Sequence, residues 1–229
     1  MRHMVVLAAV AAAACSLRAG DAAETPPFAE EIAAFAAADA ADFPAACRVL
    51  FVGSSSFRFW DTLAEDMAPI EVVRRGFGGS QMEHVNLYFD TIVAPYEPRA
   101  IVVYEGENDI SAGKSPADVV ADVERFLAMK TEALGATPVY VVSIKVSKLR
   151  FAERPAQIEA NAMIADLAAA REDVVFIDIA SAMMADDGTP KDIFIADDLH
   201  MTADGYAIWT PIIRGALEQP APTTAPGCS

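Results

Sequence analysis

Residues 48–56 read RVLFVGSSS, an apolar run that stops at a glycine and leads into three serines. A short, continuous apolar run bounded by such a turn signal is typical of a β-strand that is buried on both faces. We therefore predict a strand over Arg48–Val52. Four later runs have the same character, at residues 70–73, 100–104, 138–143 and 174–177.

The stretches between and after these strands show helical patterns. Pro116 and Pro155 each suit the first turn of a helix, where a missing N–H costs little. The predicted helices cover residues 82–89, 116–134, 155–170 and 203–217. Strands that alternate with helices form a parallel sheet with helices on both faces. The chain is therefore predicted to be an α/β protein, a three-layer α/β/α sandwich around a central parallel five-stranded sheet, with its functional loops beyond the carboxyl ends of the strands.

The composition limits the classes of partner. The chain has 229 residues, which suits one α/β domain. Acidic residues outnumber basic ones 33 to 17, for a formal net charge of −16. Nucleic-acid binding depends on Lys and Arg that neutralise phosphates, and anionic lipid surfaces also attract basic segments. The charge therefore disfavours both partners and favours a small, uncharged or cationic substrate.

The N-terminus has the pattern of an export signal. Arg2 and His3 precede the apolar stretch Met4–Ala14, and small residues follow it. The stretch is too short to span a bilayer as a helix. We predict a signal peptide over residues 1–23 and a periplasmic or secreted protein with no transmembrane segment in its mature chain. The alternatives are a lipoprotein signal that ends before Cys15, which would then carry a lipid anchor, and a buried N-terminal helix.

The rest of the chain divides into an extension, a domain and a tail. Residues 24–46 form an N-terminal extension with a short helix at about residues 30–41, and residues 47–219 form the domain. Residues 220–229 are predicted to be a flexible tail unless Cys228 fixes them. In an oxidising compartment Cys228 could form a disulfide with Cys47, which precedes the first strand. The alternative is two unrelated thiols.

A serine and a histidine are the first candidates for catalysis. Ser55 lies where the first strand ends and a helix is predicted to begin, and a serine there becomes reactive only beside a base. The chain has three histidines. His3 belongs to the predicted signal and His84 to a helical stretch, which leaves His200. Asp197 lies three residues earlier, where its carboxylate could accept the Nδ1–H of the imidazole and orient the ring.

Other interpretations of these residues stay open. Asp198 competes with Asp197 as the carboxylate that orients the histidine, and either could simply cap the final helix. The pattern DxxH is common on its own.

Two further loops could supply hydrogen-bond donors to an oxyanion. The loop after the second strand reads RGFGGS over residues 75–80, which is not a GxGxxG dinucleotide fingerprint. Its Gly79 could donate a backbone N–H. The loop after the third strand reads EGEND over residues 105–109, and Asn108 could donate from its amide. The alternatives are a tight turn and a helix cap.

Four segments, in this order, resemble the four sequence blocks of the SGNH (GDSL-type) serine hydrolases. They are Gly53-Ser54-Ser55, Gly78-Gly79-Ser80, Gly106-Glu107-Asn108-Asp109, and Asp197-x-x-His200 followed by Gly205-Tyr206. The resemblance covers residues 48–217, and it implies the flavodoxin-like sandwich of that family. It also implies that Ser55 is the nucleophile and that His200, oriented by Asp197, is its base. The implied oxyanion donors are the N–H groups of Ser55 and Gly79 and the Asn108 side chain.

One residue departs from the family pattern. Ser54 stands where the family has an aspartate before the nucleophile, so Ser54 and Ser56 are rival nucleophiles by sequence alone. The departure is expected to leave activity intact.

The resemblance implies ester hydrolysis through an acyl-enzyme. No cofactor or metal is expected, because the mature chain has few histidines and no cysteine pair with ligand spacing. The sequence has no long insertion that could form a lid. We therefore expect short acyl esters as substrates, such as acetyl groups on extracellular carbohydrate. Lysophospholipid and thioester hydrolysis remain open. So do two rival classes, a non-catalytic carbohydrate-binding or surface module on the same fold and a flavodoxin-like nucleotide or redox module.

Four basic residues follow the fourth predicted strand. They either edge the cleft and meet polar groups of the substrate or form a solvated face. They are Lys145, Lys148, Arg150 and Arg154.

Overall fold

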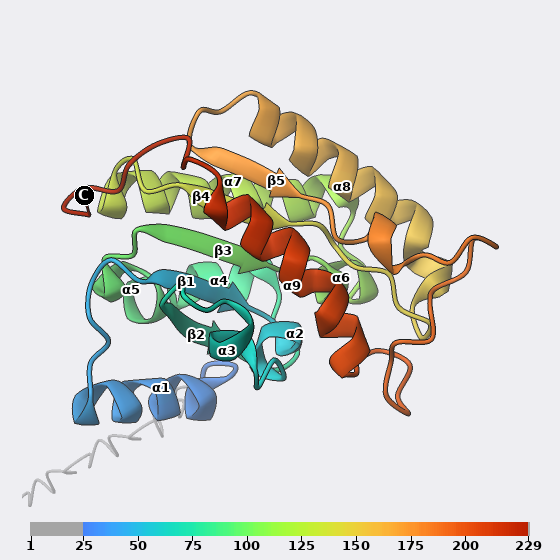
Figure 1. Ribbon diagram of the computed structural model, residues 1–229, viewed down its shortest axis with the longest axis horizontal. Coiled ribbons are helices and arrows are strands. Elements are labelled where there is room, and N and C mark those ends of the chain that lie inside the picture. The colour runs from blue at the N-terminus through green and yellow to red at the C-terminus, as the bar shows by residue number, and fades with distance from the viewer. Residues whose placement is uncertain (1–24, 229) are drawn as a thin grey trace, which may run out of the picture.

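Five parallel strands form the centre of the molecule, in the order β2-β1-β3-β4-β5 (Figure 1). The computed structural model describes residues 25–228. All five predicted strands are present, and four of them lie within about a residue of the predicted bounds. Their bounds are β1 (Val49–Gly53), β2 (Val72–Gly76), β3 (Ala100–Tyr104), β4 (Val139–Val142) and β5 (Val174–Ile177).

The prediction for β2 was displaced toward the N-terminus: residues 70–73 were expected and Val72–Gly76 is found. The apolar run stops at Val73, but the strand continues through Arg74 and Arg75. An edge strand can carry such side chains because they reach groups beyond the sheet. Arg74 Nη1 donates to the Trp60 carbonyl at 2.6 Å, and Arg75 forms a salt bridge with Asp39.

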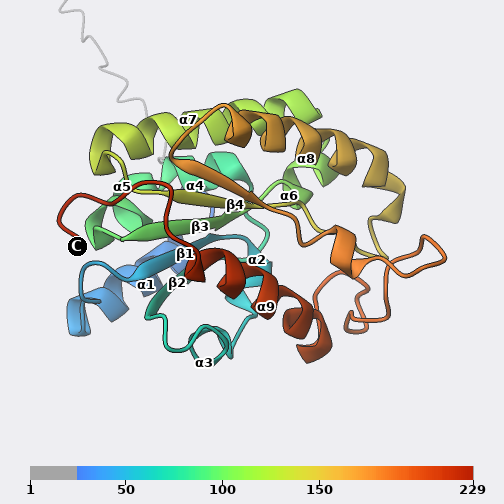
Figure 2. The same ribbon diagram turned by 45° about the horizontal axis from the view of Figure 1, so that its top comes forward.

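Helices cover both faces of the sheet, which gives the three predicted layers (Figure 2). One face carries α4 (Met82–Leu87), α5 (Phe89–Ile92), α7 (Pro116–Leu134) and α8 (Arg154–Ala169), with the N-terminal helix α1 (Ala29–Ala41) against α5. The other face carries α2 (Ser55–Arg58), α3 (Leu63–Asp66) and α9 (Ala203–Glu218). The short helix α6 (Glu107–Ser111) follows β3, and 3₁₀ turns occur at Ala94–Tyr96, Phe151–Glu153 and Ser181–Met183.

Each face of the sheet has its own apolar core. The α2–α9 side is filled by aromatic rings, including those of Phe57, Trp60 and Trp209, which are fully buried. On the other side α7 contributes Val123, Phe126 and Leu127 to the core against the sheet. The N-terminus of α7 is fixed as the sequence suggested, with Pro116 in its first turn and the Ser115 hydroxyl accepting from the Asp118 N–H.

Gly53 ends β1 at a position that only glycine can occupy. Its φ is 147°, and a Cβ there would lie 2.0 Å from the Tyr104 carbonyl oxygen. This close approach keeps β1 and β3 in register, with Gly53 opposite Tyr104 on one side and Gly76 of β2 on the other. The loops after β1, β2 and β3 therefore leave the sheet at the same level.

A disulfide joins Cys47 to Cys228, with their Cα atoms 5.5 Å apart. The sequence predicted a flexible tail unless Cys228 fixed it, and the described part of this segment makes specific contacts. Ala225 is buried, and the Thr223 hydroxyl donates to the Ala136 carbonyl at 2.6 Å. The bond lies at the end of the sheet opposite to the loops named above, because Cys47 precedes β1.

The predicted signal peptide and Cys15 lie outside the described residues. Within residues 25–228, none of the helices combines the length and the apolar character that crossing a membrane requires.

Candidate active site

The predicted site residues lie on loops at the carboxyl end of the sheet. Ser55 follows β1 as the first residue of α2, Gly79 follows β2, and Asn108 lies in the first turn of α6 after β3. Asp197 and His200 lie on the loop that leads into α9. The shared strand register brings the first three loops to one edge of the sheet.

Three side chains form a continuous chain of hydrogen bonds. Ser55 Oγ lies 2.9 Å from Nε2 of His200, and Nδ1 of the same ring lies 2.6 Å from Oδ2 of Asp197. The other oxygen of Asp197 accepts the backbone N–H groups of Leu199 and His200, each at 2.9 Å. A base that contacts the hydroxyl, held by a carboxylate on its far side, is the arrangement that activates a serine for attack.

The geometry also separates each candidate from its rivals. Ser54 and Ser56 are each 3% exposed, whereas the hydroxyl of Ser55 is the one that contacts His200. Asp198 has a φ of 55°, and its carbonyl accepts the Leu149 N–H at 3.0 Å. The left-handed turn at Asp198 leaves the carboxylate of Asp197 as the one that reaches the imidazole.

The Asp197 carboxylate is held in its charged form. Partial burial acts to raise its pKa, but the hydrogen bonds from the His200 ring and from two backbone N–H groups outweigh burial and lower the pKa to about 2. The carboxylate is therefore ionised throughout the neutral range. It can support the positive charge that the imidazole acquires when it accepts a proton from the serine.

The predicted oxyanion donors are free to receive a ligand. Within residues 25–228 the backbone N–H groups of Ser55 and Gly79 make no hydrogen bond to the protein. Gly79 has a φ of 74°, a conformation that favours glycine, and a Cβ there would meet open space. Asn108 Nδ2 donates one N–H to the Ser80 carbonyl at 2.7 Å, which leaves its second N–H available.

A buried ion pair lies under the site, and sequence reasoning missed it. Lys145 is 1% exposed. It therefore does not lie on a solvated face, which was one of the two alternatives predicted for the four basic residues after the fourth strand. Its Nζ lies 2.5 Å from Oε2 of Glu107 and donates to the Leu199 carbonyl at 3.0 Å. Burial lowers the pKa of Lys145, and the carboxylate of Glu107 opposes that shift. The pair joins α6, which carries Asn108, to the residue before His200.

Three residues with exposed apolar side chains contact the loop that carries Asp197 and His200. Phe59 is 47% exposed, and its ring meets the His200 ring edge-on with centroids 4.8 Å apart. Ile195 is also exposed and donates its N–H to the His200 carbonyl, and the exposed Leu149 donates to Asp198. We call Phe59, Leu149 and Ile195 the apolar rim. These exposed side chains belong to residues that contact the catalytic loop.

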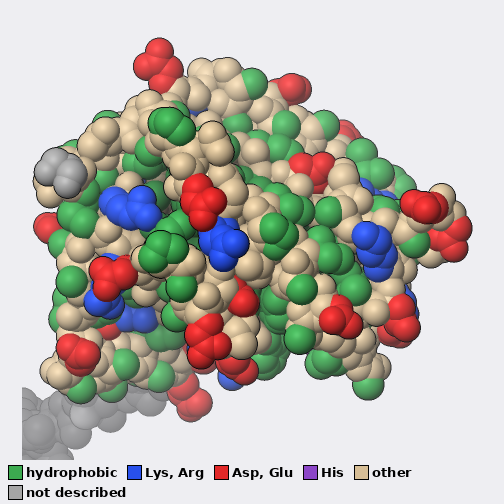
Figure 3. Space-filling view, in the orientation of Figure 1, with side chains coloured by type: hydrophobic (Ala, Val, Ile, Leu, Met, Phe, Trp, Pro, Cys, Tyr) green, Lys and Arg blue, Asp and Glu red, His purple; other side chains and the backbone are tan. Residues whose placement is uncertain are grey.

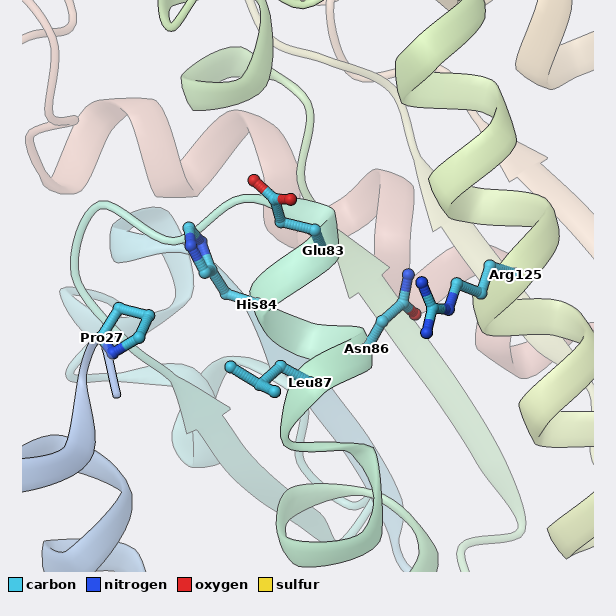
Figure 4. Close-up of a pocket in the computed structure, with 6 residues that line it drawn as sticks. All are labelled: Pro27, Glu83, His84, Asn86, Leu87 and Arg125. Atoms are coloured by element: carbon cyan, nitrogen blue, oxygen red, sulfur yellow. The ribbon is translucent and has the colours of Figure 1, made fainter. Parts of the chain in front are cut away.

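The remaining histidine of the described chain has a structural role. His84 Nδ1 accepts the backbone N–H of Gln81 at 3.0 Å, and its ring lies edge-on to Phe28. His84 also lines a separate cavity of about 370 Å³ beside α4 (Figure 4). The six residues that line this cavity do not include Ser55, Asp197 or His200. Burial lowers the pKa of His84, against the opposing effect of nearby Glu83.

The charged side chains of the described residues form no metal-binding cluster, and on the face drawn in Figure 3 they form no single basic patch. Among residues 25–228 no group of three or more His, Cys, Asp or Glu side chains is placed to hold a metal ion. Acidic and basic side chains are interspersed over the face that includes α9 (Figure 3).

Residues 45–208 of the sequence match the GDSL-like Lipase/Acylhydrolase family. Among solved structures, a Streptococcus pneumonia protein described as a platelet activating factor superposes with a TM-score of 0.73 at 19% identity, covering 82% of this chain and 92% of that one. A GDSL-like lipase from Bacteroides thetaiotaomicron gives 0.70 at 20% identity, covering 82% and 97%. A carbohydrate esterase family 3 protein from Talaromyces cellulolyticus gives 0.62 at 16% identity, covering 76% and 97%.

No curated protein is significantly similar to this sequence. The solved structures share the fold, and the family match spans most of the described domain, including every site residue named above. The chain belongs to the GDSL-like lipase/acylhydrolase family, and it is a hydrolase of that family.

Proposed function

We propose that the protein is a serine ester hydrolase that cleaves short acyl esters through an acyl-enzyme on Ser55. The observation that carries this proposal is the unbroken chain of hydrogen bonds from Ser55 through His200 to Asp197, at 2.9 and 2.6 Å. A non-catalytic binding module on the same fold would not need these hydrogen bonds. We also propose that the protein is exported, on the pattern of residues 1–23 and on the disulfide, which persists in oxidising compartments.

The reaction follows from the geometry in two steps. His200 Nε2 takes the proton of Ser55 Oγ as that oxygen attacks the ester carbonyl, and the carbonyl oxygen becomes an oxyanion. When the C–O bond of the ester breaks, the alcohol leaves with the proton from His200. Water then attacks the acyl-enzyme with His200 again as base, which releases the acid and restores the serine.

The oxyanion would be stabilised by three donors that the protein leaves free. They are the N–H groups of Ser55 and Gly79 and the second N–H of Asn108. Donors that are already in place where charge develops cost no reorganisation during the reaction, and each is typically worth roughly a hundred- to a thousandfold in rate.

Short acyl groups fit the open surface around Ser55. The His200 side chain is 21% exposed and that of Asp197 41% exposed, so the site is shallow. The apolar rim can contact a small acyl group. Two structural neighbours, the carbohydrate esterase family 3 protein and an acetyl-xylooligosaccharide esterase from Geobacillus, are esterases by name. We propose acetyl groups on extracellular carbohydrate as the substrate class.

The test is hydrolysis of p-nitrophenyl acetate, butyrate and octanoate by the purified protein. Ser55→Ala and His200→Ala are expected to lower kcat by at least about a thousandfold, because residues of such a triad act as a unit. Ser54→Ala is the matched control, since its side chain makes no capping bond and its loss should leave turnover intact. A phosphonate label should attach to Ser55 and be found there by mass spectrometry.

The chain-length profile tests the substrate class. Turnover of the acetate ester above the octanoate ester supports short acyl groups, and the reverse order favours a lysophospholipid or thioester substrate. If the folded protein hydrolyses no ester faster than its Ser55→Ala variant, the esterase proposal fails and a binding module takes its place.

A further inference from the structure

We propose that Arg150 is a positioning residue for the oxyanion hole, whose guanidinium holds the Asn108 amide with its free N–H toward the developing oxyanion. Arg150 Nη1 donates to Asn108 Oδ1 at 2.9 Å. The two residues lie 42 positions apart and come from different loops, Arg150 after β4 and Asn108 after β3. The proposal deepens the function proposed for Ser55 and rests on it.

The amide of Asn108 has a donor end and an acceptor end, and both have partners. The Ser80 carbonyl accepts from Nδ2 at 2.7 Å, while Arg150 donates to Oδ1. The reverse orientation would set the amide NH₂ against the guanidinium, donor against donor, and the amide oxygen against a carbonyl. Arg150 and the Ser80 carbonyl therefore favour the same orientation, and in that orientation the second N–H of Nδ2 stays free.

The segment that carries Arg150 is itself fixed to the loop of the catalytic histidine. The N–H of Leu149 donates to the carbonyl of Asp198 at 3.0 Å, and Lys148 forms a salt bridge with Asp192 at 2.6 Å. Lys145, earlier in the same segment, forms a buried salt bridge with Glu107 of α6. Arg150 thus joins the oxyanion side of the site to its acid–base side, and its side chain needs no rearrangement when substrate arrives.

The charge of Arg150 adds to the effect of its position. A hydrogen bond from a cation to an amide oxygen draws electron density toward that oxygen, which makes the amide N–H a stronger donor. The hydrogen bond to Asn108 Oδ1 is the contact that ties Arg150 to the oxyanion hole, so a positioning role predicts that the effect of Arg150 on kcat depends on Asn108. This dependence separates a positioning role from direct contact with substrate.

A double-mutant cycle tests that dependence. Arg150→Met should lower kcat about tenfold to a hundredfold, less than the loss of a complete oxyanion donor, and leave KM within about twofold. In an Asn108→Ala background the same substitution should change kcat by less than about twofold. Arg150→Lys should recover part of the loss. Arg125→Met, which removes an exposed arginine of α7, is the matched control and should leave kcat unchanged.

Two outcomes of this cycle overturn the proposal. The first is an equal fall in kcat in both backgrounds, which would mean that Arg150 does not act through Asn108. The second is a rise in KM with kcat unchanged, which would make Arg150 a substrate contact.

A spectroscopic measurement keeps the test independent of ester turnover. The side-chain NH₂ resonances of Asn108, identified by their loss in Asn108→Ala, should shift in Arg150→Met and shift less in Arg150→Lys. Unchanged resonances in Arg150→Met overturn the proposal whatever the activity. If the wild-type protein hydrolyses no ester, the proposed function has failed, and the resonances still decide whether Arg150 orients Asn108.

Discussion

Removal of the Cys47–Cys228 disulfide should destabilise the fold without changing the chemistry. The bond joins residues separated by 181 positions, so it encloses most of the domain. A cross-link of this kind acts mainly on the unfolded chain, whose freedom it restricts. The perturbation we choose is the double substitution Cys47→Ala/Cys228→Ala, which removes both thiols together.

The magnitude follows from the length of the loop. The chain-entropy relation gives about 5 kcal/mol at 25 °C for a loop of 181 residues, as an upper value. Disulfides typically contribute about 2–4 kcal/mol. We therefore expect the free energy of unfolding to fall by about 2–5 kcal/mol, and the melting temperature to fall by about 5–15 °C for a domain of this size.

Urea unfolding followed by tryptophan fluorescence measures the change. The two tryptophans, Trp60 and Trp209, are fully buried against each other in the core between α2 and α9, so their emission reports on global unfolding. Ester turnover at 25 °C should be unchanged, because the bond lies at the end of the sheet opposite to Ser55. Wild-type protein treated with a reductant should reproduce the destabilisation of the variant.

An unchanged urea midpoint in the variant, with mass spectrometry showing an intact disulfide in the wild type, would mean that the cross-link does not stabilise the fold. A loss of turnover that exceeds the loss of folded protein would refute the separation of the bond from the active site.

Two further substitutions test the electrostatics of the domain. Asp197→Asn should lower kcat by about a thousandfold or more, because the imidazole loses both its orientation and the charge that stabilises its protonated form; steady-state kinetics with p-nitrophenyl acetate measures it. Asp173→Asn should lower the free energy of unfolding at pH 7 by about 3 kcal/mol, because it leaves the fully buried Lys130 without its carboxylate, 2.5 Å away. Burial acts to raise the pKa of Asp173, but Arg171 and Lys130 outweigh it and lower the pKa to about 2. The stabilisation is therefore complete above the unfolded value near pH 4 and is lost as the pH falls through about 2, so urea unfolding should show a smaller difference at pH 3 than at pH 7.

Each of these variants has its own control. Asp198→Asn, beside the catalytic carboxylate, should retain turnover, and a fall equal to that of Asp197→Asn would contradict the choice of Asp197. Glu172→Gln removes an exposed charge next to Asp173, and equal destabilisation by both substitutions would show that the buried ion pair is not the cause.

The strands and helices of the fold could be predicted from local patterns in the sequence. Short apolar runs, the first of them ending at Gly53, indicated all five strands, and helical patterns such as that of α7 indicated the principal helices. Burial of one face or of both imposes a pattern that a single segment displays. The candidate residues were also accessible, since Asp197 and His200 are close neighbours in the chain and Ser55 follows a strand. The four blocks in order predicted the family.

Contacts between residues far apart in the chain depended on the three-dimensional arrangement of the strands and loops. The family resemblance paired Ser55 with His200 across 145 positions, and the disulfide across 181 positions was one of two alternatives. No sequence pattern indicated that Arg150 meets Asn108, 42 positions away. These contacts depend on strand order and register, which a local pattern does not encode because several topologies bury the same residues. Lys145 shows the same limit. Its charge favours water, and it is buried only because the loop after β3 brings the carboxylate of Glu107 to it.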